Sequence, residues 1–195
     1  MRPPVVHRLP PSPRDFVLLD DARAGGTGAR LYADPVDRIV ASRPADIKPA
    51  LAALRAATRH GLHAAGYLRY EAGHALEPAL APLARDAREG EAPLLWFGLF
   101  PRCTILPADA VPSLLPAADP ASHGSACPAL SAESHGAALS KILDYIRAGD
   151  IYQANLTMAA TVPMRGDPLA AYAAIRPRAA MGHGALVRQD GRHIL

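Results

Sequence analysis

The stretch Ser131–Val162, SAESHGAALSKILDYIRAGDIYQANLTMAATV, is the segment from which the rest of the chain is best interpreted. Its first half has one apolar stripe at the i, i+3, i+4, i+7 spacing of an α-helix. The stripe consists of Leu139, Ile142, Leu143 and Ile146. The Ser131 hydroxyl can accept a hydrogen bond from a free amide of the first turn, and Gly149 can end the helix in the left-handed conformation. The first half is therefore predicted to be an amphipathic helix.

From Tyr152 to Val162 the period changes to two, which predicts a strand with one apolar and one polar face. The polar face carries Gln153, Asn155, Thr157 and Thr161. The pattern alone allows two interpretations of that face. Solvent exposure is favoured, because antiparallel sheets often have one face in water. The alternative is that these amides and hydroxyls line a polar pocket.

Composition excludes several classes of protein. The 195 residues suffice for one domain or one and a part, and half of them are hydrophobic. The net charge of +3 comes from scattered arginines without interleaved aromatic residues, so no nucleic-acid partner is expected. No apolar run approaches the roughly 20 residues of a membrane span. The start of the chain lacks an apolar secretory segment, and two cysteines form no framework, so a cytoplasmic location is expected.

Four segments are predicted along the chain. Residues 1–13 form a Pro-rich tail, and residues 14–106 form an N-terminal α/β domain. Residues 107–130 are rich in Pro, Ala and Ser and form a linker. Residues 131–195 begin a second domain, which is expected to be incomplete because the chain ends within a predicted strand.

Local patterns place the elements of these segments. Strands are predicted at Phe16–Leu19, Arg30–Tyr32, Arg38–Ala41, Leu62–Tyr70, Pro93–Phe100, Cys103–Leu106, Gly184–Arg188 and His193–Leu195. The glycines of Ala24–Gly28 favour a hairpin loop over a phosphate loop. The strand at 103–106 is expected to pair with the one at 93–100. Helices are predicted at Asp46–Arg59, capped by Asp46, and at Leu169–Ile175, stopped by Pro177.

No arrangement of residue types in the sequence identifies a particular reaction. His60 and His63 straddle a helix end at Gly61, and no carboxylate completes a metal site with them. Neither cysteine lies at a predicted helix start, and no pair of carboxylates suggests acid–base chemistry. We therefore assign no catalytic residue and no metal ligand in this chain.

Four segments in order carry a family resemblance. IRAGDIYQANLT at 146–157 is similar to the helix-to-strand junction of the chorismate-utilising enzymes. The segment at 16–41, with Leu-Leu-Asp-Asp, resembles the opening strands of aminodeoxychorismate synthase component I. GYLRYE at 66–71 followed by WFG at 96–98, and GALVRQDGRHIL at 184–195, match the same group. Anthranilate synthase component I shares the architecture but fits the first segments less well.

The resemblance implies an α+β fold of packed antiparallel β-sheets with flanking helices, of the anthranilate synthase component I type and here truncated. Residues 131–195 would then begin the chorismate-binding domain. The implied reaction is amination of chorismate to 4-amino-4-deoxychorismate, on the route to p-aminobenzoate and folate. The implied partner is a glutamine amidotransferase that supplies ammonia, and the implied cofactor is Mg²⁺.

The family's Mg²⁺ ligands and active-site residues would follow Leu195, so this chain alone is expected to be an inactive N-terminal portion. Two alternatives remain. The first is a protein similar to anthranilate synthase component I of tryptophan biosynthesis. The second is a non-catalytic module that docks an amidotransferase, or a truncated remnant.

Two groups of site residues follow from the resemblance. Relatives bind tryptophan between a Leu-Leu-x-Ser segment and a Pro-Tyr-Met-like segment. The corresponding positions here are Leu19, Asp20, Asp21, Met181 and Gly182. Asp21 replaces the small hydroxyl residue, and the proline is absent. For the polar face of the strand predicted at 152–162, the resemblance favours a role in the protein over exposure to solvent. It implies that Gln153, Asn155 and Thr157 support the substrate region from behind, with Gln153 as the first candidate.

Overall fold

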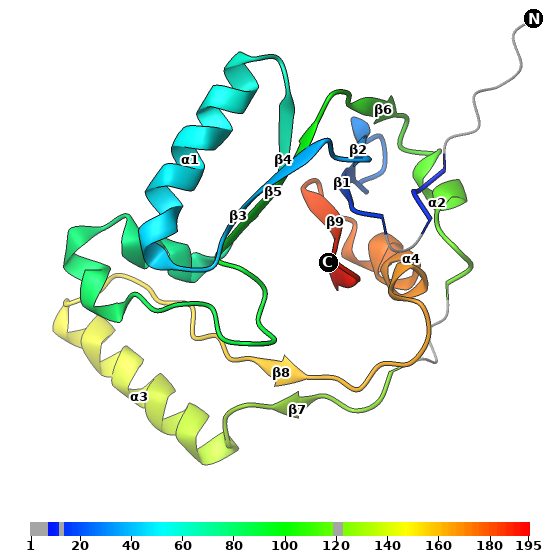
Figure 1. Cartoon of the computed structure of the whole chain (residues 1–195). Coiled ribbons are helices and arrows are strands. Elements are labelled where there is room, and N and C mark those ends of the chain that lie inside the picture. Colours follow the sequence, from blue (N-terminus) through cyan, green and yellow to red (C-terminus); the bar gives the residue numbers. More distant parts are fainter. Residues whose placement is uncertain (1–7, 12–13, 119–122) are drawn as a thin grey trace, which may run out of the picture. The chain divides into compact units, whose positions relative to one another are not determined.

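A computed structural model describes residues 8–11, 14–118 and 123–195 of the chain. The remaining parts of the predicted tail at 1–13 and of the predicted linker at 107–130 lie outside the described residues. The chain divides into two compact units, one formed by Met1–Ala118 with Pro168–Leu195 and one formed by Asp119–Asp167. Antiparallel sheets with helices beside them confirm the predicted α+β class (Figure 1).

The first unit contains a five-stranded antiparallel sheet of order β10-β9-β1-β2-β6. Its strands are β1 (Phe16–Asp21), β2 (Gly28–Ala33), β6 (Thr104–Leu106), β9 (Gly184–Gln189) and β10 (Arg192–Ile194). β1 and β2 form the predicted hairpin, and its loop contains Gly25 at φ +70°. Residues 184–194 thus belong to the same sheet as β1, although the sequence-based division groups them with residues 131–183.

A three-stranded sheet of order β3-β5-β4 completes the strands of the first unit. Its strands are β3 (Asp37–Ala41), β4 (His63–Leu68) and β5 (Leu95–Phe100). Helix α1 (Pro44–Arg59) packs on this sheet through its predicted stripe, which includes Ile47, Ala50 and Leu54 (Figure 1). Two 3₁₀ segments, Tyr70–Ala75 and Pro78–Leu83, follow β4.

Each face of the five-stranded sheet carries buried side chains, but different neighbours cover the two faces. One face carries Phe16 and Leu18 and packs with Tyr172 of helix α4 (Pro168–Ala179) and Val111 of helix α2 (Val111–Leu114). The other face carries Val17 and Val187 and packs against three residues of the second sheet. Those residues are Ala65, Trp96 and Phe100. Period-two alternation along β1 therefore separates two cores.

The second unit consists of β7 (Cys127–Pro128), α3 (Ala132–Ala148) and β8 (Ala160–Thr161). Both predicted caps of α3 are confirmed. The Ser131 hydroxyl accepts a hydrogen bond from the Ser134 amide at 3.1 Å, and Gly149 adopts φ +83°. The predicted strand over 152–162 is wrong, because only Ala160–Thr161 pairs with another strand. Alternating side chains make a strand only where a neighbour supplies the ladder of hydrogen bonds.

Three smaller expectations in the first unit are corrected. β6 pairs with β2 and not with β5, because its Leu106 is buried in the core of the five-stranded sheet. Asp46 is not a cap. Helix α1 starts two residues earlier, at Pro44, whose fixed φ suits a first turn, and Asp46 pairs with Arg43 instead. The predicted helix end before Pro177 is also wrong, because α4 continues through Pro177 to Ala179. A proline removes one backbone hydrogen bond but does not prevent a further half turn.

Candidate functional site

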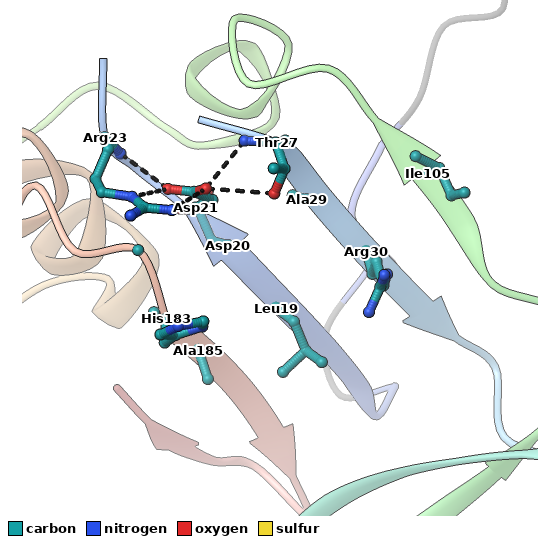
Figure 2. Close-up of a pocket in the computed structure, with 13 residues that line it drawn as sticks. Leu19, Asp20, Asp21, Arg23, Thr27, Ala29, Arg30, Ile105, His183 and Ala185 are labelled. Atoms are coloured by element: carbon teal, nitrogen blue, oxygen red, sulfur yellow. Dashed lines mark hydrogen bonds and ion pairs between the residues drawn. The ribbon is translucent and has the colours of Figure 1, made fainter. Parts of the chain in front are cut away.

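A cavity of about 530 Å³ lies on one face of the five-stranded sheet, formed by β9, β1, β2 and β6. Strand register brings one row of four side chains onto this face. Leu19 of β1 is opposite Ala185 of β9 and Arg30 of β2, and Arg30 is in turn opposite Ile105 of β6. Directly opposed residues have Cβ atoms about 5 Å apart, so the row forms a continuous floor with three apolar members and one cation (Figure 2).

The floor stays open because neighbouring positions carry little side-chain volume. Gly28, Gly182 and Gly184 line the same cavity. A Cβ at Gly182 would lie 2.6 Å from the Cζ atom of Arg23, and a Cβ at Gly28 would lie 2.2 Å from the Leu106 carbonyl oxygen. On the other side of the floor, the next row of this face contains Val17, Val187 and Tyr32 and is covered by the second sheet. The cavity is thus the part of this face that the second sheet does not cover.

Asp21 closes one end of the cavity and is held by its own hairpin loop. Its carboxylate accepts two hydrogen bonds from the Arg23 guanidinium, both at 2.9 Å. The Thr27 amide donates to it at 2.9 Å and the Thr27 hydroxyl at 3.3 Å (Figure 2). The Arg23 side chain, followed by the Thr27 amide, holds the pKa of Asp21 well below its usual range. Asp21 is consequently an ionised group whose charge Arg23 neutralises.

Asp20 points to the opposite face of β1, toward α4. Its side chain is completely buried, and its Oδ2 accepts hydrogen bonds from the Tyr172 hydroxyl at 2.8 Å and from the Arg176 Nε at 2.6 Å. The second nitrogen of Arg176 donates to Asp20 Oδ1 at 3.0 Å. Burial, and then the bond to Asp20, raise the pKa of the Tyr172 phenol. This cluster fastens α4 to β1 and leaves the Asp20 carboxylate no capacity to bind a ligand.

The structure brings together most of the residues assigned to a tryptophan-type pocket. Leu19, Asp20, Asp21 and Gly182 all line the cavity. Met181 does not line it, but its carbonyl accepts a hydrogen bond of 2.8 Å from the Ala22 amide, which joins the two segments. Tryptophan binding at these residues stays a prediction.

Sequence reasoning missed the residues that complete the cavity wall. These are Arg23, Thr27, Gly28, Ala29, Arg30, Ile105, His183, Gly184 and Ala185. Most of them could have been found from a correct strand register, since Leu19 as a starting point leads directly to Ala185 and Arg30. Ile105 could not be found without knowing that β6 pairs with β2, because this pairing brings Ile105 beside Arg30.

Gln153, Asn155 and Thr157 lie in the second unit, on the irregular segment between α3 and β8, and all three are exposed. Their suggested role in supporting a substrate region stays a prediction. The described residues include no group of three or more His, Cys, Asp or Glu placed to bind a metal ion. Among the same residues, no helix combines the length and apolar character of a membrane span.

Comparison with known proteins gives one match. A family model described as chorismate binding enzyme matches residues 14–195, which is nearly the whole chain. Neither the curated proteins nor the solved structures provide a match.

Proposed function

Because the chain belongs to the chorismate-binding enzyme family, we propose that it forms part of an enzyme of the aminodeoxychorismate synthase component I type. The proposed reaction is the amination of chorismate to 4-amino-4-deoxychorismate, with ammonia from a glutamine amidotransferase. The complete enzyme is proposed to act in the cytoplasm on the route to p-aminobenzoate. Mg²⁺ is proposed only for the complete enzyme, since the described residues offer no fitting set of ligands and no step is assigned to the metal here.

The observation that carries this proposal is the ordered match of the four segments, in particular the Leu-Leu-Asp-Asp strand. That strand is β1, the central strand of the five-stranded sheet, and the last matched segment forms β9, which pairs with β1, and β10, which pairs with β9. The two most distant segments of the resemblance are therefore neighbours in space. The same architecture would suit anthranilate synthase component I, which remains the second candidate because its family shares these strands.

The cavity supports a further part of the proposal, an effector site. Leu19, Asp21 and Gly182 come from two segments far apart in the sequence and line one hollow, in which the described residues form no metal-binding cluster. Its floor is mainly apolar, and the Asp21 carboxylate is already held by Arg23 and Thr27, which fits ligand binding better than chemistry. We assign it to an indole-type effector, with Asp21 and Arg23 at its polar end.

The function is tested by complementation. The complete open reading frame that contains codons 1–195 is expressed in a bacterial strain that requires p-aminobenzoate and in one that requires tryptophan. Growth of the first strain only is expected. Growth of the second only would reassign the protein to the anthranilate branch. Growth of neither, with the protein present and a matching amidotransferase supplied, would favour a non-catalytic docking module and refute the proposed activity.

The reaction itself is then followed with purified protein, chorismate and ammonium salt. Anthranilate is detected directly by fluorescence, and 4-amino-4-deoxychorismate after conversion to p-aminobenzoate by an added lyase. Residues 1–195 alone are expected to form neither product. Turnover by this chain alone would show that it contains catalytic groups that we have not assigned.

A further inference from the structure

The charged groups of the cavity described above determine which ligand it can accept. Arg30 stands in the middle of the floor, directly between Leu19 and Ile105 in the strand register. Its side chain is exposed, and among the described residues no carboxylate forms an ion pair with it. Figure 2 shows the guanidinium on the same face of the sheet as Leu19 and Ala185. The cavity therefore presents the Arg30 guanidinium to a ligand without a competing carboxylate partner.

Neither aspartate that lines the cavity offers it a free carboxylate. The Asp21 side chain is only 5% exposed, and Arg23 and Thr27 occupy both of its oxygens. The Asp20 side chain is 0% exposed and is held by Tyr172 and Arg176 on the far face of β1. A ligand ammonium group would thus find no free carboxylate. Because the charges of Arg23 and Asp21 cancel and His183 can add no negative charge, the surplus charge of the cavity is positive, and Arg30 carries it.

We propose that this cavity binds an organic carboxylate with an apolar body and does not require an α-ammonium group on the ligand. The carboxylate is bound by Arg30, and the apolar body lies on Leu19, Ala185 and Ile105. The inference rests on the effector role proposed for this cavity and specifies the ligand class. A free α-amino acid is the poorer ligand, because its ammonium group loses hydration beside a net positive wall without gaining a counter-ion.

Three indole compounds separate the contributions of the two ligand charges. Indole-3-propionate has the carboxylate alone, tryptamine has the ammonium alone, and tryptophan has both. Isothermal titration calorimetry at neutral pH is expected to show indole-3-propionate binding at least about tenfold more tightly than tryptophan, which corresponds to about 1.4 kcal/mol. Tryptamine is expected to give no measurable binding.

Variants then identify the group responsible. Arg30→Gln should weaken indole-3-propionate binding at least about tenfold, and Arg30→Lys should recover part of that loss. Arg55→Gln is the matched control, since it removes an exposed arginine of α1 that does not line the cavity. Ala185→Leu fills the floor without altering charge and should also abolish binding. Thermal melts of each variant show whether it is folded, and Arg30 is exposed, so its replacement should leave the midpoint nearly unchanged.

Each outcome has a defined meaning. Binding of tryptophan or tryptamine in preference to indole-3-propionate would overturn the ligand class while leaving an effector site in place. Equal loss in the Arg30 and Arg55 variants would overturn the role of Arg30. Absence of binding by all three compounds would overturn both the ligand class and the effector site. None of these results depends on chorismate amination, which the complementation experiment tests separately.

Discussion

The Asp20 cluster provides the sharpest test of how this fold is held together. Asp20→Asn preserves the size of a completely buried side chain and removes its charge. It leaves Arg176, whose side chain is 11% exposed, without its carboxylate, and the acceptors that remain beside it among the described residues are the neutral amide oxygen at position 20 and the Ala108 carbonyl at 3.4 Å. Breaking a buried ion pair by removing one partner costs about 3–5 kcal/mol. We expect a loss near the lower end, about 3 kcal/mol, because Arg176 retains some contact with water.

The measurement is the free energy of unfolding from urea titrations of wild type and variants. Tyr172→Phe removes only one of the three hydrogen bonds to Asp20 and should cost about 1.5 kcal/mol, so it calibrates the effect. A double-mutant cycle of Asp20→Asn with Arg176→Gln isolates the pair, and a coupling energy above about 1 kcal/mol is expected. A loss below about 1 kcal/mol for Asp20→Asn, with no coupling, would refute the view that this pair fastens α4 to β1.

Three further predictions concern a charge, a glycine and a cap. Hydrogen bonds, first from the Arg85 guanidinium and then from the Arg88 amide, lower the pKa of Glu91 from 4.5 to about 2. The stability due to this carboxylate is therefore complete above pH 4.5 and disappears as the pH falls toward 2. Glu91→Gln should remove that portion of the acid dependence in urea titrations, and an unchanged pH profile would contradict this. Gly28→Ala forces a Cβ to 2.2 Å from the Leu106 carbonyl at φ +94° and should cost about 1–3 kcal/mol in thermal or urea unfolding. Ser131→Ala removes the N-terminal cap of α3 and should destabilise that helix by about 1 kcal/mol. The expected readout is faster amide hydrogen exchange in the first turn of α3. Unchanged exchange rates would rule out a stabilising role for the capping hydrogen bond.

Local patterns in the sequence predicted most elements because their causes are local. The stripe of α1 and the caps Ser131 and Gly149 each depend on residues a few positions apart, and all three are present in the structure. The β1–β2 hairpin likewise followed from its glycine-rich loop. Such features need no knowledge of distant segments, since propensity and capping act within one or two turns of the chain.

The errors arose where a distant partner decides the outcome. The alternation over 152–162 suggested a strand, yet a strand also needs a neighbour, and only Ala160–Thr161 has one. β6 was assigned to the adjacent β5, although burial of Leu106 draws it to β2. No local signal distinguishes these cases, because pairing is chosen by the total apolar area that each arrangement buries. Because strand pairing could not be predicted locally, the sequence alone did not show that Arg30 and Ile105 line the candidate site.

The alternation along β1 explains why one strand can serve stability and binding separately. Leu18 and Asp20 face α4, where burial is complete, whereas Leu19 and Asp21 face the cavity. A one-residue slip of register would exchange the two sets and place the Asp20 carboxylate in the cavity. The bond between Asp20 and Arg176 opposes that slip, because it holds only when Asp20 points to α4. The charge of the cavity is therefore fixed from the opposite face of the sheet, by residues that a ligand does not touch.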